Sequence, residues 1–253
     1  MPLLQINNLT QRFGGLTAVQ DFSFDLPKRV LPGLIGPNGA GKTTIFNIVC
    51  GFYQPTTGTI DFDHHAIAGL RPNAITARGI ARTFQNIRLW SEMTVLDNLC
   101  IAQHAKLGYG LWDAIIQSSK FKYREKQVHK TAMHLLETLN LQDYANEKPK
   151  SLPYGLQRRV EIARALAAQP KLLLLDEPAA GMNSSEVEQL IQLIQWIRKT
   201  FDITIWLIEH DMRVVMGVCE RIVVLDFGEI IADGTPETIQ NDPRVIKAYL
   251  GEQ

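Results

Sequence analysis

The sequence has no excess of charge of either sign, few cysteines and no long apolar run. It contains 26 Lys and Arg residues against 26 Asp and Glu residues, so bulk electrostatics favour neither nucleic acid nor an anionic membrane surface as a partner. No segment approaches the roughly 18 consecutive apolar residues of a membrane span, and residues 1–5 lack the basic start of a secretory signal. We therefore expect a cytoplasmic protein that does not bind nucleic acid and that reaches a membrane only by docking onto another protein.

The three cysteines, Cys50, Cys100 and Cys219, lie far apart in apolar surroundings. Such spacing predicts buried thiols in a reducing compartment rather than a disulfide framework. With 253 residues and 45% hydrophobic content, the chain can bury a large core. The length and composition favour one large α/β unit, or such a unit with an inserted subdomain.

The most informative motif is the run from Gly36 to Thr44, Gly-Pro-Asn-Gly-Ala-Gly-Lys-Thr-Thr, which follows the apolar stretch 31–35. Its glycines let the backbone curl so that N–H groups point inward at a phosphate chain. Lys42 reaches the β and γ phosphates, the Thr43 hydroxyl holds Mg²⁺, and the helix that opens at Gly41 adds its positive end. The residues expected to bind the nucleotide here are Asn38, Gly39, Ala40, Gly41, Lys42, Thr43 and Thr44.

The hydrophobic pattern predicts an α/β protein with near-continuous apolar strands of the kind found in covered parallel sheets. Pro32 is compatible with a central strand only as its first residue. The expected strands are 3–9, 19–26, 32–35, 57–62, 79–84, 171–176, 203–208, 221–226 and 228–231. The expected helices are 41–51, a largely helical insertion over 93–141, one from Pro153 to before Pro170, 184–199 and two small C-terminal ones.

Two acids follow the apolar strand at residues 172–175, a combination with a clear use in nucleotide hydrolases. Ligands of open α/β sheets bind at the carboxyl edge, where Asp176 can hold Mg²⁺ directly or through water and Glu177 can polarise an attacking water. His210 ends the next apolar strand and should lie near Glu177, where it can orient water or sense a γ-phosphate. A lone histidine at a strand end is, however, more often structural.

In this order, the motifs resemble the ATP-binding subunits of ATP-binding-cassette (ABC) transporters over essentially the whole chain. The resemblance implies a mostly parallel core sheet, an antiparallel β subdomain and an inserted helical subdomain. It further implies that Phe13 stacks on adenine with Val19 nearby; from the residues alone, Phe13 is equally well a core anchor. The implied catalytic residues are Lys42, Gln85, Glu177 and His210, the implied Mg²⁺ ligands are Thr43, Gln85 and Asp176, and Gly155 and Asn183 join the nucleotide-binding set.

The family's signature segment, usually Leu-Ser-Gly-Gly-Gln, is here Leu152-Pro153-Tyr154-Gly155-Leu156. In the family it faces the γ-phosphate of ATP bound to a second copy, which implies a dimer with two nucleotides at its interface. The serine hydroxyl is missing, but Gly155 still offers its N–H at a helix start and Pro153 is tolerated there. The implied partners are a second ATPase subunit, identical or paralogous, two transmembrane permease subunits and, indirectly, a solute-binding protein, with the chain on the cytoplasmic face of the membrane.

Three further stretches narrow the resemblance to ATPases of branched-chain or hydrophobic amino-acid importers. They are 154–164, 178–183 with Asn183 where most cassettes have aspartate, and 243–251. Urea-uptake and lipopolysaccharide-export ATPases share parts of this pattern and stay open as alternatives, as do a non-transport ABC ATPase and a small-molecule phosphotransferase. We expect one ABC ATPase domain over 1–253, with the nucleotide-binding core in 1–86 and 165–253 and the helical subdomain in 87–164.

Aromatic residues of the insertion divide into two groups. Trp90 and Met93 follow Gln85, where the family receives a helix of the membrane subunit, although Trp90 is equally well insertion core. Trp112, with Leu111 and Ile115, is expected to form a core stripe. The charges from Lys120 to Lys130 are expected on a solvated helix face.

Overall fold

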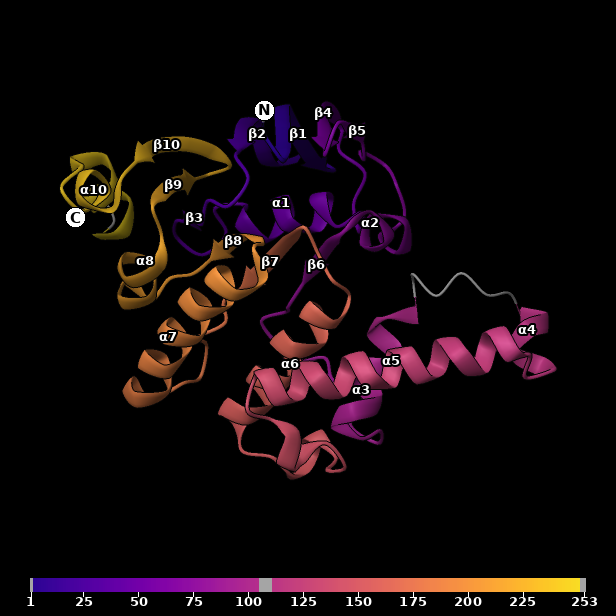
Figure 1. Cartoon of the computed structure of the whole chain (residues 1–253). Helices are drawn as coiled ribbons and strands as arrows, with labels where there is room; N and C mark the ends of the chain where they lie inside the picture. Colours follow the sequence, from indigo (N-terminus) through magenta and orange to yellow (C-terminus); the bar gives the residue numbers. More distant parts are fainter. Residues whose placement is uncertain (1, 105–110, 251–253) are drawn as a thin grey trace.

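The computed structural model describes residues 2–104 and 111–250, which form two sheets and a group of helices (Figure 1). The strands are β1 (Leu4–Phe13), β2 (Leu16–Leu26), β3 (Pro32–Ile35), β4 (Thr57–Phe62), β5 (His65–Ala66), β6 (Ile80–Arg82), β7 (Leu172–Asp176), β8 (Thr204–Ile208), β9 (Arg221–Asp226) and β10 (Glu229–Gly234). The helices are α1 (Lys42–Val49), α2 (Pro72–Arg78), α3 (Val95–Ala102), α4 (Leu111–Ile115), α5 (Ser119–Thr138), α6 (Tyr154–Ala167), α7 (Ser184–Phe201), α8 (Met212–Val218), α9 (Pro236–Gln240) and α10 (Pro243–Leu250).

The larger sheet has six strands in the order β10-β9-β3-β8-β7-β6, parallel except for the edge strand β10. Pro32 is the first residue of β3, as predicted, so the inner ladder loses no interior donor. Asp176 pairs with Ile208 at the carboxyl ends of β7 and β8. The expected parallel core sheet is confirmed, and its register brings the ends of these two strands to one edge.

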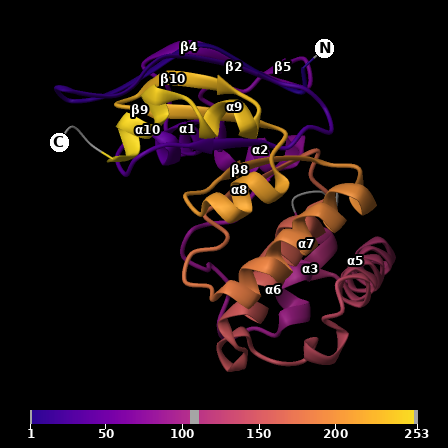
Figure 2. The same ribbon diagram turned by 90° about the vertical axis from the view of Figure 1, so that its left-hand side faces the viewer.

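The smaller sheet is antiparallel, in the order β2-β1-β4-β5, and α1 lies between it and the larger sheet (Figure 2). Trp206 of β8 packs between the layers. Its fully buried ring stacks on the Phe24 ring of β2, with 4.9 Å between the ring centroids, and packs edge-on against the Phe46 ring of α1, with 5.1 Å between the centroids. Burying such large rings strongly favours association of the layers. The helix that follows the phosphate loop is therefore held from both sides.

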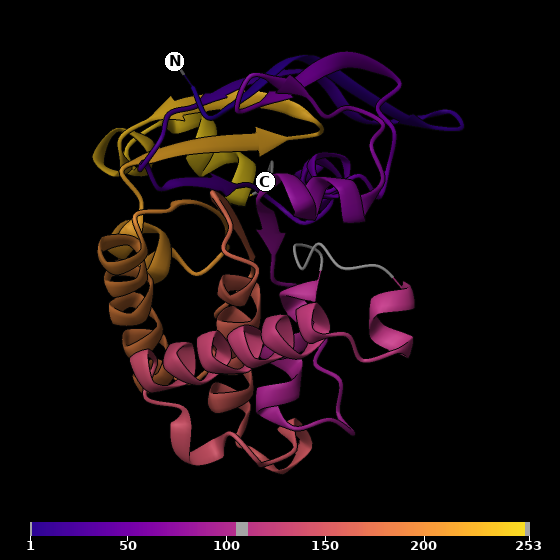
Figure 3. The ribbon, with the colours of Figure 1, turned by 45° about the vertical axis from the view of Figure 1, so that its right-hand side comes forward.

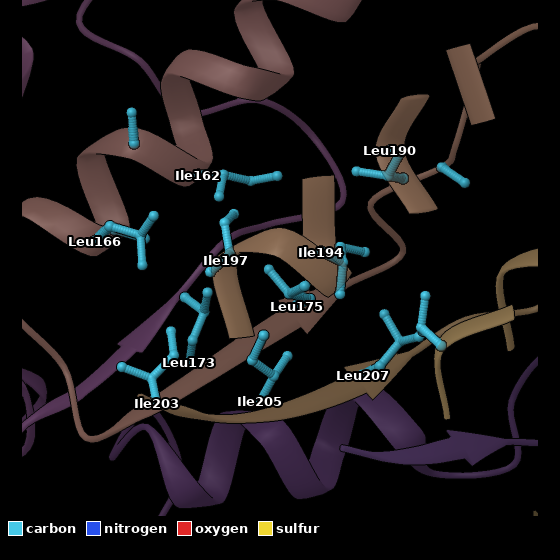
Figure 4. Packing of buried hydrophobic residues seen from close by; sticks show 14 of the residues in the cluster. Ile162, Leu166, Leu173, Leu175, Leu190, Ile194, Ile197, Ile203, Ile205 and Leu207 are labelled. Atoms are coloured by element: carbon cyan, nitrogen blue, oxygen red, sulfur yellow. The ribbon is translucent and has the colours of Figure 1, made fainter. Parts of the chain in front are cut away.

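The opposite face of the larger sheet is covered by α6 and α7. Leu173 and Leu175 of β7 point toward this side, whereas Leu172 and Leu174 join the core around α1, because successive strand side chains alternate between faces. Figure 4 shows how these layers pack, with Ile162 and Leu166 of α6 and Ile194 and Ile197 of α7 against Leu173, Leu175, Ile205 and Leu207. The strands are apolar throughout because both of their faces are buried.

Helices α3, α5 and α6 lie together on the side away from the antiparallel sheet (Figures 1 and 3). The apolar face of α5 is buried, and it comprises Val128, Ala132, Leu135 and Leu136, followed by Leu139. The lysines at 120, 122, 126 and 130 are exposed, as expected for a solvated face.

The expected core stripe at Trp112 is wrong. Trp112 is 77% exposed and Ile115 is 61% exposed, while the Leu111 side chain lies outside what is described. The reason is the shortness of α4, which has only five residues and contacts α5 near the distal end of that helix. One and a half turns at the edge of the molecule leave most of the stripe in solvent (Figure 1).

The structure also tests several smaller predictions. β1 and β2 are longer than predicted, the strand expected over 79–84 shrinks to β6, and α2 and α8 were not predicted. Cys50 and Cys219 are buried, which raises the pKa of their thiols to about 11 and about 12, and Cys100 is partly buried. Within the described ranges, no helix combines the length and apolar character that a membrane crossing requires.

Candidate nucleotide site

The loop between β3 and α1 has the backbone of a phosphate cradle. Gly36, Gly39 and Gly41 have φ of 146°, 82° and 102°, values at which side chains are strained. A Cβ on Gly36 would meet the Leu225 carbonyl oxygen at 2.0 Å, and one on Gly41 would meet the Ala18 oxygen at 2.4 Å. The loop is therefore pressed against β9 and β2 on its inner side.

The outer side of the same loop is open. A Cβ on Gly39 would meet nothing within 4 Å, and both Asn38 and Gly39 are exposed. Thr43 is exposed in the first turn of α1, Thr44 is half-buried and Ala40 is buried beneath the loop. A phosphate chain can thus approach the loop N–H groups and the positive end of α1 from solvent.

Lys42 is buried, and its ammonium donates to the carbonyl oxygens of Gly36 and Pro37, both at 2.7 Å. Burial lowers the pKa of Lys42, and the carboxylates of Glu177 and Asp176 partly offset this effect. The lysine therefore lies within electrostatic reach of both acids while its hydrogen bonds go to its own loop.

Asp176 is buried at the end of β7 and forms an ion pair with Arg82 of β6, with 2.6 Å between Arg82 Nη2 and Asp176 Oδ2. Arg82 also donates to the Asn47 side chain of α1 at 2.7 Å. The parallel pairing of β6 with β7 places this arginine beside the strand end. Sequence reasoning missed Arg82, because nothing local in 80–82 identifies the strand next to β7.

Three of the predicted catalytic residues meet at the edge of the sheet. Gln85 Nε2 donates to Glu177 Oε2 at 2.6 Å, and His210 Nδ1 lies 3.7 Å from the same oxygen. Glu177 has a φ of 46°, and its N–H donates to the Ile208 carbonyl at 2.9 Å, which ties it to the end of β8. The expected proximity of His210 to Glu177 is therefore present in the structure.

Glu209 was not considered from the sequence, yet it organises this edge. Its carboxylate is 1% exposed and accepts hydrogen bonds from the N–H groups of Ala179 at 2.8 Å, His210 at 2.7 Å and Asp211 at 3.0 Å. These bonds link the segment after Glu177 to the turn that carries His210. The signal for Glu209 in the sequence was its position between an apolar strand and His210.

A fully buried ion pair on α6 holds the segment that follows β6. Arg158 Nη1 lies 2.7 Å from Glu161 Oε2, and both side chains are 0% exposed. Arg158 also donates to the carbonyl oxygens of Phe84 at 2.6 Å and Gln85 at 2.7 Å. Glu161 Oε1 accepts from the Arg88 N–H at 3.2 Å. The backbone around Gln85 is thus fastened to the helix that begins at the signature segment.

Gly155 and Asn183 do not join the cluster around Lys42. Gly155 lies in the first turn of α6, where an added Cβ would be 2.9 Å from the Glu186 carboxylate of α7. Asn183 caps α7 by accepting from the Glu186 N–H at 3.0 Å. Pro153 is the cap residue of α6, and Tyr154 donates to the Ala180 carbonyl at 2.9 Å. These residues form a second surface at the starts of α6 and α7.

The residues expected near adenine differ in accessibility. Phe13 is 41% exposed at the end of β1 and meets Tyr53 edge-on at 5.2 Å, so it is not a core anchor. Val19 is fully buried, and its Cγ2 would lie 3.3 Å from a Cβ on Gly41. Phe13 offers a ring to solvent, whereas Val19 supports the loop from beneath.

Trp90 and Met93 are 46% and 37% exposed, so Trp90 is not enclosed in the helical core. The Trp90 backbone is held by Asn98, which accepts from its N–H at 2.9 Å and donates to its carbonyl at 3.1 Å. Arg164 lies over the indole ring at 5.3 Å. A rigid, partly exposed aromatic surface therefore follows Gln85.

The donor set at this edge fits Mg²⁺ and a nucleotide. Thr43, Asp176 and Gln85 supply hydroxyl, carboxylate and amide oxygens, the hard ligands that Mg²⁺ prefers when phosphates complete its shell. No group of three or more His, Cys, Asp or Glu residues suited to a metal occurs in the described part of the chain.

Comparisons with known families and proteins also indicate a nucleotide-binding protein. Residues 19–180 match a family model described as ABC transporter, and residues 229–253 match one described as branched-chain amino acid ATP-binding cassette transporter. The chain is 48% identical to the high-affinity branched-chain amino acid transport ATP-binding protein LivG of Salmonella typhimurium and 47% identical to BraF of Pseudomonas aeruginosa, over 99% of this chain and 98% of each relative. It is 35% identical to the lipopolysaccharide export system ATP-binding protein LptB of Haemophilus influenzae, over 100% of this chain and 99% of that protein.

Solved structures show the same fold. The ADP conformation of an ATP-binding cassette of an ABC transporter matches with a TM-score of 0.86 and 31% identity, covering 100% of both chains. A dimeric post-hydrolysis cassette bound to ADP and Pi matches with a TM-score of 0.76 and 26% identity, covering 92% of this chain and 98% of the other.

Proposed function

Because the chain belongs to the ABC transporter family and is an ATPase, we propose that it energises a membrane importer of branched-chain or other hydrophobic amino acids. The observation that carries the substrate is the 47–48% identity, over nearly the whole chain, to proteins named for branched-chain amino acid transport. The C-terminal match at residues 229–253 points to the same group. The cassette itself supplies the energy, and the solute is handled by its partners.

ATP binds in this proposal with its phosphates in the open side of the loop at 36–44. Lys42 exchanges its bonds with the loop carbonyls for the β and γ phosphates, and Asn38 to Thr44 supply N–H and hydroxyl donors. The exposed ring of Phe13 stacks on adenine above the buried Val19. Supporting this assignment, the loop is tightly backed on one side and free on the other.

Glu177 is the general base that takes a proton from the attacking water. Its hydrogen bond to Gln85 and the nearby His210 keep the carboxylate oxygen at the sheet edge, where a water can be held between the three side chains. Gln85 orients this water, and His210 forms a hydrogen bond with it. The γ-phosphate then leaves as inorganic phosphate.

Thr43, Asp176 and Gln85 are the residues that hold Mg²⁺, which neutralises charge that develops on the transferred phosphoryl group. Asp176 must share its carboxylate between this role and Arg82. The ion pair joins Arg82 Nη2 to Asp176 Oδ2 at 2.6 Å.

A second ATPase subunit, identical or paralogous, completes the site. Gly155 offers its N–H at the start of α6 to the γ-phosphate bound by the other subunit, and Asn183 lies beside it at the start of α7. The dimeric cassette bound to ADP and Pi supports face-to-face pairing of two such chains. The separation of Gly155 from Lys42 in one chain requires this pairing if both are to meet one nucleotide.

Two permease subunits receive the mechanical output on the cytoplasmic face of the membrane, and a solute-binding protein delivers the solute to them. We assign the nucleotide-binding core with its β sheet to 1–86 and 165–253, and the helical subdomain to 87–164. The partly exposed Trp90 and Met93, directly after Gln85, suit the permease contact.

Uptake by the living cell tests the proposal. In a strain that lacks this chain, uptake of labelled leucine is expected to fall, and the wild-type chain but not Glu177→Gln is expected to restore it. Unchanged leucine uptake in the deletion strain would overturn the amino-acid assignment. Loss of urea uptake instead would move the same ATPase to another solute.

Lipopolysaccharide export is the second candidate, because the chain is 35% identical to LptB over its whole length. A deletion strain with normal leucine uptake but defective surface lipopolysaccharide would favour it. Release of phosphate to water without an acceptor separates both transport roles from a phosphotransferase, and co-purification with permease subunits separates them from a non-transport ATPase.

A further inference from the structure

One hydrogen bond joins the C-terminal helix α10 to the first residue of the phosphate loop. The Gly36 N–H donates to the Tyr249 hydroxyl oxygen at 2.9 Å, across 213 positions of sequence. α10 lies beside β10, and Val245 anchors it with a side chain only 7% exposed (Figure 2). The bond therefore connects the loop to the last described element of the chain.

Gly36 is the turning point of the loop. Its φ of 146° and its close packing against Leu225 leave no room for a side chain, and two hydrogen bonds add to this packing in fixing the orientation of its peptides. Its carbonyl oxygen accepts from Lys42 on one side, and its N–H donates to Tyr249 on the other. When Lys42 turns to phosphate, the bond to Tyr249 is the one that stays available to Gly36.

The Tyr249 hydroxyl is suited to this role. Tyr249 is 41% exposed, and the partial burial of its side chain raises the pKa of Tyr249, so the group stays neutral at physiological pH and keeps an oxygen lone pair for the Gly36 N–H. A buried backbone N–H that loses its partner is costly, which gives the loop a reason to keep the orientation that meets the hydroxyl.

We propose that Tyr249 is a positioning residue for the nucleotide site, holding the first peptide of the phosphate loop in its phosphate-binding conformation from α10. The inference rests on the proposed function, because it requires ATP in this loop. Without the bond, the loop spends part of its time in other conformations, and apparent affinity falls by the fraction of competent loop. By reciprocity, bound nucleotide must stabilise the docking of α10 by the same factor.

The test compares Tyr249→Phe with the wild-type full-length chain, using a fluorescent, nonhydrolysable ATP analogue with Mg²⁺. The change removes only the hydroxyl, so the analogue is expected to bind about 2- to 10-fold more weakly, the usual net contribution of one hydrogen bond. The KM for ATP should rise by a similar factor with kcat little changed, because no reacting atom is touched. Tyr123→Phe removes the hydroxyl of a tyrosine that is 61% exposed on α5 and should change neither quantity.

A second set of measurements includes hydrogen exchange, which needs no variant, and a comparison of melting temperatures. Hydrogen exchange of the α10 amides is expected to slow when the analogue binds to the wild-type chain, and the analogue should raise the melting temperature less in Tyr249→Phe. A merely structural tyrosine lowers the melting temperature without nucleotide but leaves the affinity unchanged.

The outcomes separate the two ideas. The role of Tyr249 is overturned, and the proposed function stays intact, if Tyr249→Phe binds the analogue as tightly as the wild type. The same holds if the hydrogen-exchange rate of the α10 amides does not change when the analogue binds. A wild-type chain that does not bind the analogue overturns the proposed function first. If Tyr249→Phe does not fold, the exchange measurement on the wild type decides alone.

Discussion

Replacing Glu161 with glutamine should destabilise the chain far more than its single lost charge suggests. The substitution keeps the size of the side chain and one oxygen, but leaves the guanidinium of Arg158 without its counter-charge. Both side chains are 0% exposed, with 2.7 Å between Nη1 and Oε2. Water cannot reach the arginine to replace the lost partner.

The magnitude follows from that burial. Removing one member of a buried ion pair costs about 3–5 kcal/mol, because an uncompensated charge remains in a medium of low polarity. For a domain of this size, 1 kcal/mol corresponds to about 2–4 °C in melting temperature. Glu161→Gln should therefore melt about 6–20 °C below the wild type.

A matched surface pair provides the control. Arg198 and Glu220 are also 2.7 Å apart, but their side chains are 29% and 50% exposed. Such a pair contributes about 0–1 kcal/mol, so Glu220→Gln should shift the melting temperature by no more than about 4 °C. Thermal unfolding followed by circular dichroism, in the absence of nucleotide, measures both variants.

Equal melting temperatures for Glu161→Gln and Glu220→Gln would refute the reasoning, since contact length is the same and only burial differs. ATPase activity adds a functional readout. Arg158 donates to the carbonyl oxygens of Phe84 and Gln85, so displacement of the Arg158 side chain should loosen Gln85 and lower the rate of phosphate release.

Four further outcomes are expected. Glu177→Gln should bind ATP but release phosphate about 10²- to 10⁴-fold more slowly, as for a lost general base, and near-normal turnover would contradict that role. ATP affinity should fall with rising pH before pH 10.5, because burial lowers the pKa of Lys42 and a lysine that has lost its proton must take one up to bind the phosphates. Lys42→Arg stays charged, so a titration of this variant with the fluorescent ATP analogue should give the same affinity at each pH. Asn183→Ala should lose about 1 kcal/mol in a denaturant titration because α7 loses its cap, whereas Asn183→Asp should keep it. Pro153→Ser, which supplies the cap side chain that α6 lacks, should leave ATPase activity equal or higher, and a collapse of activity would reveal a role for Pro153 beyond the contacts described.

Most of the fold was predictable because its signals are local. The apolar runs of β7 and β8 identify covered parallel strands, and the glycine-rich loop fixes where β3 ends and α1 begins. Short elements were harder. α8 has seven residues, and its N-cap is Asp211, whose side chain accepts from the Arg213 N–H, a cap signal that was available but not used.

The candidate site divides in the same way. Asp176 ends β7, Glu177 and His210 lie just after β7 and β8, and Lys42 follows the loop after β3, so the topology of the sheet is enough to bring them together. Arg82 and Tyr249 were not predictable, because their partners lie 94 and 213 positions away. Their contacts arise from the neighbour relations of β6 with β7 and of α10 with the loop, and no spacing in the sequence encodes these relations.

Arg158 and Glu161 show a third kind of limit. Their spacing of three residues on a helix suggests an exposed pair of little energetic value. Burial comes from the segment 84–88, which covers the pair and uses its remaining donors and acceptors. The value of a pair visible in the sequence thus depended on a segment some 70 positions away.

Charged groups of the candidate site already have partners without a nucleotide. Lys42 bonds to loop carbonyls, Asp176 pairs with Arg82, and Glu177 accepts from Gln85. In the proposed function, the phosphates replace the loop carbonyls as partners of Lys42, while Asp176 shares its carboxylate between Arg82 and the metal, so binding does not leave a buried charge bare. This exchange favours a site that is rigid before binding, since the same backbone holds both sets of partners. It also predicts that variants removing an internal partner, such as Arg82→Met beside Asp176, disturb the free chain more than the nucleotide-bound one, because in the proposed site a bound metal would supply Asp176 with another counter-charge.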